Sequence, residues 1–339
     1  MKVLKELFVE VTNRCCQKCV HCSSSAQFKN YPEISLDNLK GLVNQGVPLG
    51  LERMTLSGGE PFLYKDLLPA VKYFGEKGLT TSVYTCGVIL SHEGAYTSID
   101  GSIFKTLQEH GLKRVIFSLH GATAARQDFI SQTPGSFDLV MKSITAAVHS
   151  GVEVELHTVP MRYNLNDIEN IFDIAVAQKI KKVSLLRFVP QGRGTKVMEP
   201  TRADYLHIKK MYSVWQKKYS TLQIRMGAPY NCLSLAGKAC TAGIDKLLIN
   251  AWGEYFPCEA FKFMHGIRPT IYNRRLNIEW ENDPLLKALR EIDIDKVTVC
   301  SSCAYQKECA GGCAGQRMHR NGSMFVGPDP SCLMRETGE

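Results

Sequence analysis

Three cysteines with a spacing suited to metal chemistry lie near the start of the chain. Cys15, Cys19 and Cys22 follow an apolar stretch, residues 7–11, with C-x3-C-x2-C spacing. Three thiolates hold three irons of a [4Fe–4S] cluster and leave the fourth iron able to bind an exogenous group. A cluster that only transfers electrons normally has four cysteine ligands, so this loop predicts a cluster that takes part in a reaction.

A structural zinc site is the alternative for this loop. Zinc in structural sites takes four protein ligands, whereas the loop supplies three usable thiols. Cys16 is a further cysteine nearby, but its side chain is expected to point away from the partners of its immediate neighbour. We therefore favour iron–sulfur chemistry over zinc here.

A glycine-rich turn, Ser57-Gly58-Gly59-Glu60-Pro61, follows the second expected strand. Gly58 and Gly59 would let the backbone approach a ligand without a side-chain clash. Glu60 supplies a hydrogen-bond acceptor. Alone, the motif indicates a turn, but behind a three-cysteine loop it indicates a ligand site.

Most of the thirteen cysteines lie in the C-terminal third of the chain. Gly253 precedes one of them with G-x4-C spacing, and a later run has C-x2-C-x5-C-x3-C spacing. The cysteines of this region are Cys232, Cys240, Cys258, Cys300, Cys303, Cys309, Cys313 and Cys332. Tight spacings without a secretory context favour metal binding over disulfides. A pair of zinc knuckles is the alternative to iron–sulfur clusters.

The composition of the 339-residue chain is typical of a folded protein, with 44% hydrophobic and 22% charged residues. The sequence has no run of eighteen apolar residues and no signal-peptide pattern, which predicts a cytoplasmic protein without a membrane span. The formal net charge of +8 is modest. Because the basic residues are scattered without interleaved aromatics, nucleic-acid binding is not expected.

Short β-type runs alternate with longer helical patterns over residues 1–190, which predicts a parallel βα array. The expected strands are residues 6–11, 53–56, 81–85, 114–119, 153–160 and 182–189. The expected helices are residues 35–45, 64–77, 101–110, 137–150, 167–178 and 201–219, with Ser35, Asp167 and Thr201 as N-caps. This pattern predicts an α/β fold, a partial (β/α)6 TIM-like barrel over residues 1–225, with functional residues at the carboxyl ends of its strands. Residues 226–339 are expected to form a small cysteine-rich domain in which metal clusters replace an extended core.

Together these motifs resemble the radical S-adenosylmethionine (SAM) superfamily, and the C-terminal cysteine array resembles its SPASM-type extension. Residues 57–61 resemble the family's GGEP element, which contacts the methionyl ammonium of SAM. Thr85-Cys86-Gly87 is similar to the T-N-G motif at the end of strand three. Ser118-Leu119-His120-Gly121 is similar to the motif at the end of strand four, whose serine contacts SAM. The resemblance implies SAM binding by Gly58, Gly59, Glu60 and Ser118, with Arg187 as a candidate partner of the SAM carboxylate or the substrate.

The SPASM resemblance also implies two auxiliary [4Fe–4S] clusters beside the SAM-binding one. By family analogy, the first takes Cys232, Cys240, Cys258 and Cys313, and the second takes Cys300, Cys303, Cys309 and Cys332. The allocation of Cys232 stays open, because its thiol could instead donate hydrogen. Glu259 matches an acidic residue that acts as a base in sulfatase-maturing relatives, with a structural carboxylate as the alternative. Cys86 is a candidate hydrogen-atom donor or a buried structural thiol.

The implied activity is reductive cleavage of SAM to a 5′-deoxyadenosyl radical, followed by oxidation or cross-linking of a residue in a peptide or protein. A dehydrogenase, epimerase or decarboxylase of a sugar or tetrapyrrole is the alternative enzyme. A metal-stabilised binding protein without catalysis is the alternative from another class. The implied partners are a flavodoxin- or ferredoxin-type reductant and, for a peptide substrate, a separate leader-binding protein.

Overall fold

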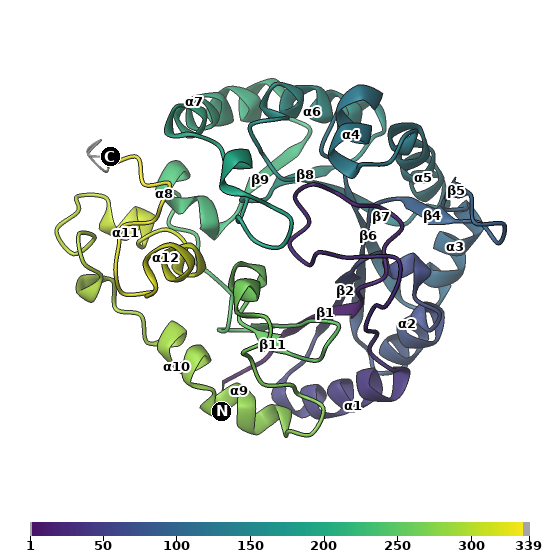
Figure 1. Ribbon diagram of the computed structural model, residues 1–339, viewed down its shortest axis with the longest axis horizontal. Coiled ribbons are helices and arrows are strands. Elements are labelled where there is room, and N and C mark those ends of the chain that lie inside the picture. The colour runs from purple at the N-terminus through teal and green to yellow at the C-terminus, as the bar shows by residue number, and fades with distance from the viewer. Residues whose placement is uncertain (1, 335–339) are drawn as a thin grey trace.

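The structure, a computed structural model, describes residues 2–334. Its centre is a nine-stranded sheet with the order β11-β10-β1-β2-β3-β6-β7-β8-β9. The sheet curves into an open barrel with helices around its outer side (Figure 1). All neighbouring strands are parallel except β11, which runs antiparallel to β10. The strands are β1 (Glu6–Thr12), β2 (Arg53–Gly58), β3 (Thr80–Thr85), β6 (Leu112–Ser118), β7 (Glu153–Thr158), β8 (Lys182–Leu185), β9 (Gln223–Met226), β10 (Lys246–Ile249) and β11 (Tyr255–Phe256).

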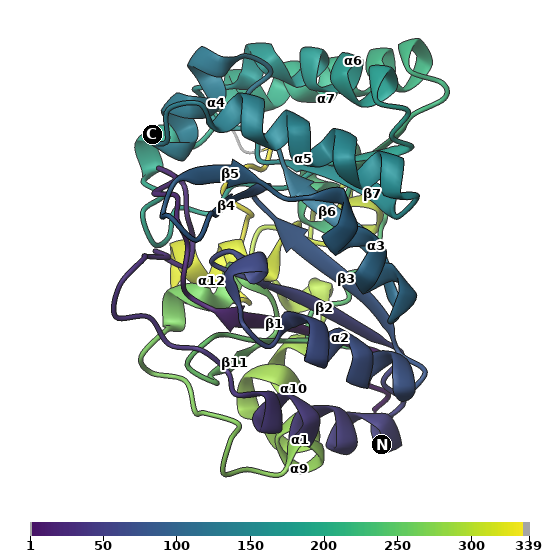
Figure 2. The same ribbon diagram turned by 90° about the vertical axis from the view of Figure 1, so that its right-hand side faces the viewer.

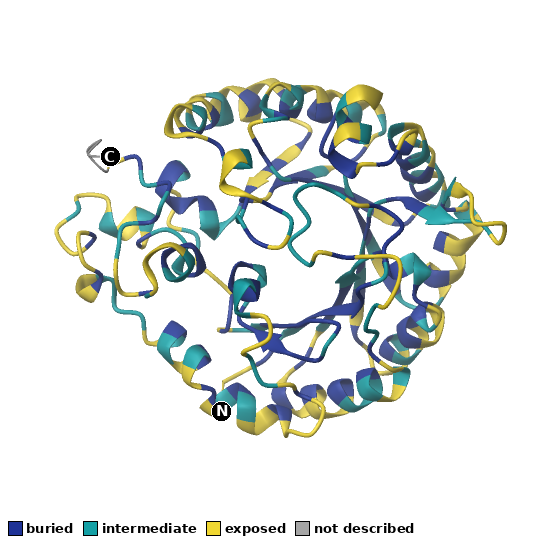
Figure 3. Ribbon diagram, in the orientation of Figure 1, coloured by how far each residue is buried: buried dark blue, intermediate teal, exposed yellow. Residues whose placement is uncertain are grey.

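Seven helices of the barrel connect these strands or follow them, and a short hairpin of β4 (Val88–Leu90) and β5 (Tyr96–Ser98) extends the loop after β3. The helices are α1 (Leu36–Gly46), α2 (Leu67–Glu76), α3 (Gly101–Glu109), α4 (Ala124–Ser131), α5 (Ser136–Ser150), α6 (Ile168–Ala177) and α7 (Arg202–Lys218). Figure 2 shows α1, α2, α3 and α5 along the outer side of the strands. Their inward faces are buried and their outward faces exposed, whereas the strands are mostly buried (Figure 3).

Helix starts follow local capping chemistry. Ser35 caps α1 by accepting a hydrogen bond from the backbone N of Asn38, as expected. Thr201 caps α7 in a capping box with Asp204, also as expected. Asp167 occupies the N-cap position of α6, as expected, but its side chain makes no capping hydrogen bond. Its Oδ2 instead accepts a hydrogen bond from Arg126 Nε at 3.1 Å.

The C-terminal region contributes directly to the barrel. The sequence predicted six strands, and the sheet has three more: β9, β10 and β11. β10 pairs with β1, with Leu7 opposite Leu247, so one edge of the sheet comes from residues beyond 226. Leu247 and Trp280 are buried in the same apolar cluster as the barrel core. The remaining helices of this region are α8 (Asn231–Ser234), α9 (Leu276–Asn282), α10 (Pro284–Arg290), α11 (Gln306–Cys309) and α12 (Ala314–Asn321).

Candidate active site

A cavity of about 510 Å³ lies at the carboxyl ends of the barrel strands. Its lining includes the end of β2, the end of β6 and the loop after β3, where the sequence placed its motifs. Two groups of cysteines from opposite ends of the chain also line it: Cys15, Cys19 and Cys22, and Cys240, Cys258 and Cys313. The fold therefore brings the N-terminal cysteine loop and part of the C-terminal array to one shared space.

The N-terminal cysteine loop is held in place by backbone contacts. Gln27 O accepts a hydrogen bond from the backbone N of Cys15 at 3.1 Å. Arg193, in the loop after β8, donates from Nε to Cys19 O at 2.9 Å and from Nη1 to Ala26 O at 2.7 Å. Its positive charge also helps to lower the pKa of the Cys15 thiol, after the larger effect of hydrogen bonds from neighbouring thiols. Sequence reasoning missed Arg193, because no motif marks it.

The two glycines of residues 57–61 dock the end of β2 against this loop. A Cβ at Gly58 would lie 2.1 Å from Thr12 O, and one at Gly59 would lie 2.0 Å from Arg14 O. Real Cβ atoms do not approach backbone oxygens so closely, so both positions require glycine. The sequence predicted that the backbone at these glycines lies close to a ligand. In the structure it lies close to the backbone of Thr12 and Arg14, at the start of the cysteine loop.

Glu60 is fully buried beside the glycines. Its carboxylate accepts hydrogen bonds from Thr85 Oγ1 at 2.8 Å, from the backbone N of Cys86 at 2.8 Å and from the backbone N of Phe62 at 3.1 Å. Burial raises its pKa to about 7, although the Cys86 hydrogen bonds act in the opposite direction. A ligand ammonium beside this carboxylate would favour its charged form.

Cys86 and Cys16, the latter within the N-terminal cysteine loop, share one hydrogen-bond acceptor. Cys86 Sγ donates to Val88 O at 3.4 Å, and Cys16 Sγ donates to the same oxygen at 3.2 Å. Hydrogen bonds to Cys15 and Cys16, together with burial, raise the pKa of Cys86. Cys86 also lines the cavity, so it presents a neutral thiol there.

Two histidines form the wall of the cavity next to Ser118. His21 Nε2 and His120 Nε2 lie 3.1 Å apart, and His120 Nδ1 accepts a hydrogen bond from the backbone N of Val159 at 3.2 Å. Burial lowers the pKa of His21 to about 4 and lowers that of His120 as well. Both rings are therefore neutral near pH 7, and this wall adds no charge to the cavity.

Arg187 does not present a free guanidinium to the cavity. It lies just beyond the end of β8, and its two terminal nitrogens bind both carboxylate oxygens of Asp329, at 2.5 and 2.6 Å. It also donates to Ser331 Oγ at 2.8 Å and to Pro229 O at 2.9 Å. The sequence assigned Arg187 to a carboxylate of SAM or substrate, whereas the structure gives it an internal carboxylate partner.

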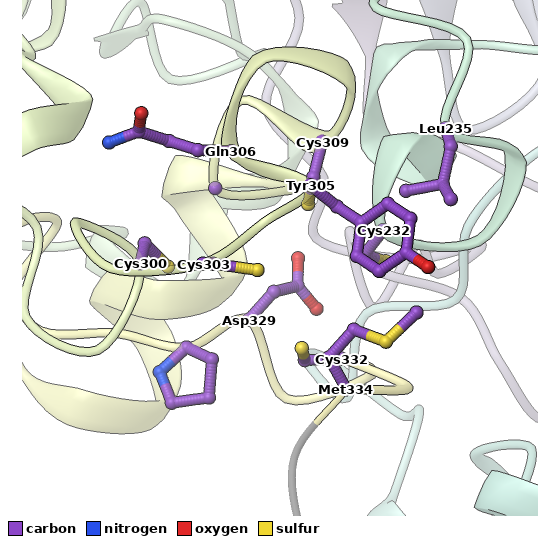
Figure 4. A pocket seen from close by; sticks show the side chains of 12 residues that line it. Cys232, Leu235, Cys300, Cys303, Tyr305, Gln306, Cys309, Asp329, Cys332 and Met334 are labelled. Carbon is purple, nitrogen blue, oxygen red and sulfur yellow. The ribbon is translucent and has the colours of Figure 1, made fainter.

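The C-terminal cysteines divide into two groups, one of which surrounds a second, smaller cavity (Figure 4). The members of that group are Cys232, Cys300, Cys303, Cys309 and Cys332, with Asp329 between them. The expected grouping placed Cys232 with the other set. The physical reason for the difference is that α8, which carries Cys232, packs against α11, and Gly237 N donates to Glu308 O at 2.9 Å.

Glu259 also lines the cavity, in the segment that follows β11. Its carboxylate is 3.2 Å from Lys246 Nζ, and 43% of its side chain remains accessible in the cavity. Partial burial opposes ionisation, but the Lys246 ammonium, together with a backbone hydrogen bond and the charge of Lys262, outweighs it and lowers the pKa of Glu259. The group is a carboxylate at neutral pH, which is the state a proton acceptor needs.

The family is decided by a match over the N-terminal half of the chain. Residues 9–175 match the family model of the Radical SAM superfamily. The chain is a radical SAM enzyme. The matched segment contains the three-cysteine loop, residues 57–61 and the strand-end motifs that line the cavity.

Curated relatives of this radical SAM enzyme match nearly its whole length. An AdoMet-dependent heme synthase from Methanosarcina barkeri is 26% identical, with 96% of this chain and 95% of the relative covered. A PqqA peptide cyclase from Rhizobium meliloti is 25% identical, with 96% and 86% covered. Among solved structures, SuiB of Streptococcus suis bound to precursor peptide SuiA matches with a TM-score of 0.79 at 17% identity, covering 98% of this chain and 77% of that one. The structural match confirms the fold.

The radical SAM enzyme uses SAM and a [4Fe–4S] cluster, and the residues of the cavity fit both. Among residues 2–334, no three His, Cys, Asp or Glu side chains converge as ligands of one metal ion. A cubane cluster is held differently, with each thiolate on its own iron. The three thiols of one loop, beside the glycines of β2, therefore suit a cluster better than a single zinc ion.

No helix among residues 2–334 has the length and apolar character needed to cross a membrane.

Proposed function

We propose that this radical SAM enzyme oxidises or cross-links a residue of a peptide or protein. When bound, the cluster and SAM together supply a 5′-deoxyadenosyl radical that removes a hydrogen atom from the substrate. The observation that carries the proposal is the shared cavity, which is lined both by the Cys15–Cys19–Cys22 loop and by Cys258 and Glu259. A substrate between them would reach the radical on one side and a proton acceptor on the other.

The N-terminal wall would hold the cofactors. Cys15, Cys19 and Cys22 would ligate the cluster, and Arg193 would fix their loop through its bonds to Cys19 O and Ala26 O. Gly58, Gly59, Glu60 and Ser118 would bind SAM, as the family resemblance implies. The neutral rings of half-buried His21 and buried His120 would help to limit the access of water to the reacting groups.

The C-terminal wall would accept the proton and electron that the substrate loses. Glu259 is ionised by Lys246 and open to the cavity, so it would take the substrate proton. Two auxiliary clusters would lie beyond it. Cys240, Cys258 and Cys313, which line the shared cavity, would hold one of them. The cysteines around Asp329 would hold the other. Cys86 would supply hydrogen to a substrate radical only if the reaction is an epimerisation.

The experiment is anaerobic incubation of the reconstituted enzyme with SAM, dithionite and the short peptides encoded beside its gene, followed by mass spectrometry. The proposal expects a peptide that loses two hydrogens per modification, in step with 5′-deoxyadenosine formation. Glu259→Gln should keep SAM cleavage and lose the peptide product. A flavodoxin or ferredoxin should replace dithionite, and a separate leader-binding protein should increase the yield. No change in mass of any such peptide would contradict a peptide substrate.

A tetrapyrrole is the second candidate substrate, favoured by a single observation. The heme synthase of Methanosarcina barkeri matches 96% of this chain, as much as the PqqA peptide cyclase does. Incubation with Fe-coproporphyrin III under the same conditions tests this candidate. A new tetrapyrrole formed in step with 5′-deoxyadenosine would assign this substrate in place of a peptide.

A further inference from the structure

Arg225 ends a row of four cross-strand neighbours in the barrel. Ser118 pairs with His157, His157 with Ser184, and Ser184 with Arg225, across β6, β7, β8 and β9. All four residues line the large cavity. Neighbouring strands are about 4.8 Å apart, so Arg225 lies three strands, roughly 14 Å along the curved sheet, from Ser118, the residue expected at SAM.

Arg225 differs from the other cations of the cavity because it has no partner. The lining contains five Lys or Arg residues and two carboxylates, Glu10 and Glu259. Lys262 pairs with Glu10, Lys246 with Glu259, and Arg187 with Asp329. Arg193 donates to two backbone carbonyls of the cysteine loop. Among the residues that the structure describes, the Arg225 guanidinium makes neither a hydrogen bond nor an ion pair.

The charge of Arg225 acts on other groups in and near the cavity. It favours a lower pKa for Tyr84, His157 and Lys238. Arg225 therefore lies within electrostatic reach of Tyr84.

Tyr84 provides a second donor in the same cavity. Its ring is fixed edge-on by Phe8, with ring centroids 5.4 Å apart, and by His157, at 5.1 Å. Burial raises the pKa of Tyr84, so the phenol stays protonated and able to donate. The planar guanidinium of Arg225 and the neutral hydroxyl of Tyr84 can both donate hydrogen bonds to one carboxylate, because a carboxylate accepts several hydrogen bonds in its plane.

We propose that Arg225 binds a carboxylate of the substrate, with Tyr84 as a second donor, and so positions the substrate between β9 and the SAM site. The proposal rests on the proposed function, because it assigns a chemical feature to that substrate. The carboxylate is either an acidic side chain of a peptide or a propionate of a tetrapyrrole. One unpaired cation suits such a monoanion.

The test is equilibrium binding of matched probe pairs to the anaerobically reconstituted enzyme. One pair is Fe-coproporphyrin III and its tetramethyl ester. The other is a capped pentapeptide with a central glutamate and its glutamine counterpart. Binding is measured for the wild type, for Arg225→Gln and Arg225→Lys, and for Arg275→Gln, a control at an arginine that is exposed like Arg225 but does not line the cavity.

The wild type and the Arg275→Gln control should prefer the carboxylate member of at least one pair by about tenfold, the effect of one charge-assisted contact. Arg225→Gln should remove the preference, and Arg225→Lys should restore part of it at unchanged iron content. The pair that responds identifies the source of the carboxylate. Equal binding of both members by the wild type, or an undiminished preference in Arg225→Gln, would overturn the proposal. Formation of 5′-deoxyadenosine by the wild type is measured separately, without a probe. A failure of SAM cleavage, and with it of the proposed function, is therefore distinguished from a failure of Arg225 to bind a carboxylate.

Discussion

Arg187 and Asp329 form a bidentate ion pair across 142 positions of sequence, with nitrogen–oxygen distances of 2.5 and 2.6 Å. Both side chains are buried, at 2% and 1% exposure. Asp329 also accepts a hydrogen bond from the backbone N of Cys313 at 2.7 Å, and it lies among the cysteines of the smaller cavity. The pair therefore connects the end of β8 to both groups of C-terminal cysteines.

Removing one partner of this pair should be costly. Asp329→Ala leaves the Arg187 guanidinium buried without its counter-charge, which typically costs about 3–5 kcal/mol. Urea unfolding should show this loss, and iron analysis should show fewer irons per chain. The control is Glu169→Gln, which breaks an exposed pair with Lys218 and should cost less than about 1 kcal/mol. Equal effects of the two substitutions would contradict the structural role of Asp329.

Gly59→Ala should separate β2 from the cysteine loop, because its Cβ would lie 2.0 Å from Arg14 O. We expect loss of the SAM-binding cluster, about four of twelve irons, with the auxiliary clusters kept. Gly41→Ala is the matched control, because no atom lies within 4 Å of a Cβ there. Within α1, that substitution should be neutral or stabilising by roughly 0.5–1 kcal/mol. Full iron content in Gly59→Ala would show that the close approach is not needed.

The grouping of the C-terminal cysteines gives a prediction about metal content. Five cysteines surround the smaller cavity, and a [4Fe–4S] cluster uses four. Cys232→Ser should therefore keep about twelve irons per chain, whereas Cys313→Ser should lower the content toward about eight. Iron and sulfide analysis after anaerobic reconstitution measures both. A fall to about eight in Cys232→Ser would contradict this prediction and show that Cys232 is a required cluster ligand.

Glu155 should make stability depend on acid pH. Burial opposes its ionisation, but hydrogen bonds from His157, Lys182 and Ser184 outweigh it and lower its pKa from 4.5 to about 2. A lowered carboxyl pKa stabilises the fold above the unfolded value and loses this effect as pH falls through the folded value. Glu155→Gln should thus cost on the order of 3 kcal/mol at pH 7 and clearly less at pH 3. Urea unfolding at both pH values measures the difference, and a pH-independent difference would contradict this account.

Local patterns in the sequence predicted the βα barrel and its motif positions well. Apolar runs located β1, β2, β3, β6, β7 and β8, whereas the short hairpin of β4 and β5 was not predicted. The motifs fell at strand ends because parallel strands share one carboxyl edge. β10 was missed because its four residues carry a weak pattern, and their pairing with β1 joins positions that are far apart in sequence.

Long-range partners explain the other differences. Arg187 looked free because its partner, Asp329, lies near the other end of the chain. Cys232 was allocated by family analogy, whereas packing of α8 against α11 decides its neighbours. Arg225 carries no motif, so only the register of β8 and β9 shows that it belongs to the cavity.

The central claim is that the loop of Cys15, Cys19 and Cys22 holds the cluster at which SAM is cleaved. The most direct measurement is 5′-deoxyadenosine formation from SAM and dithionite by the reconstituted wild type and by a variant with all three cysteines changed to alanine. We predict 5′-deoxyadenosine from the wild type and none from the variant, which should retain about eight irons in its auxiliary clusters. Equal 5′-deoxyadenosine formation by both proteins, or none from a fully iron-loaded wild type, would contradict the account.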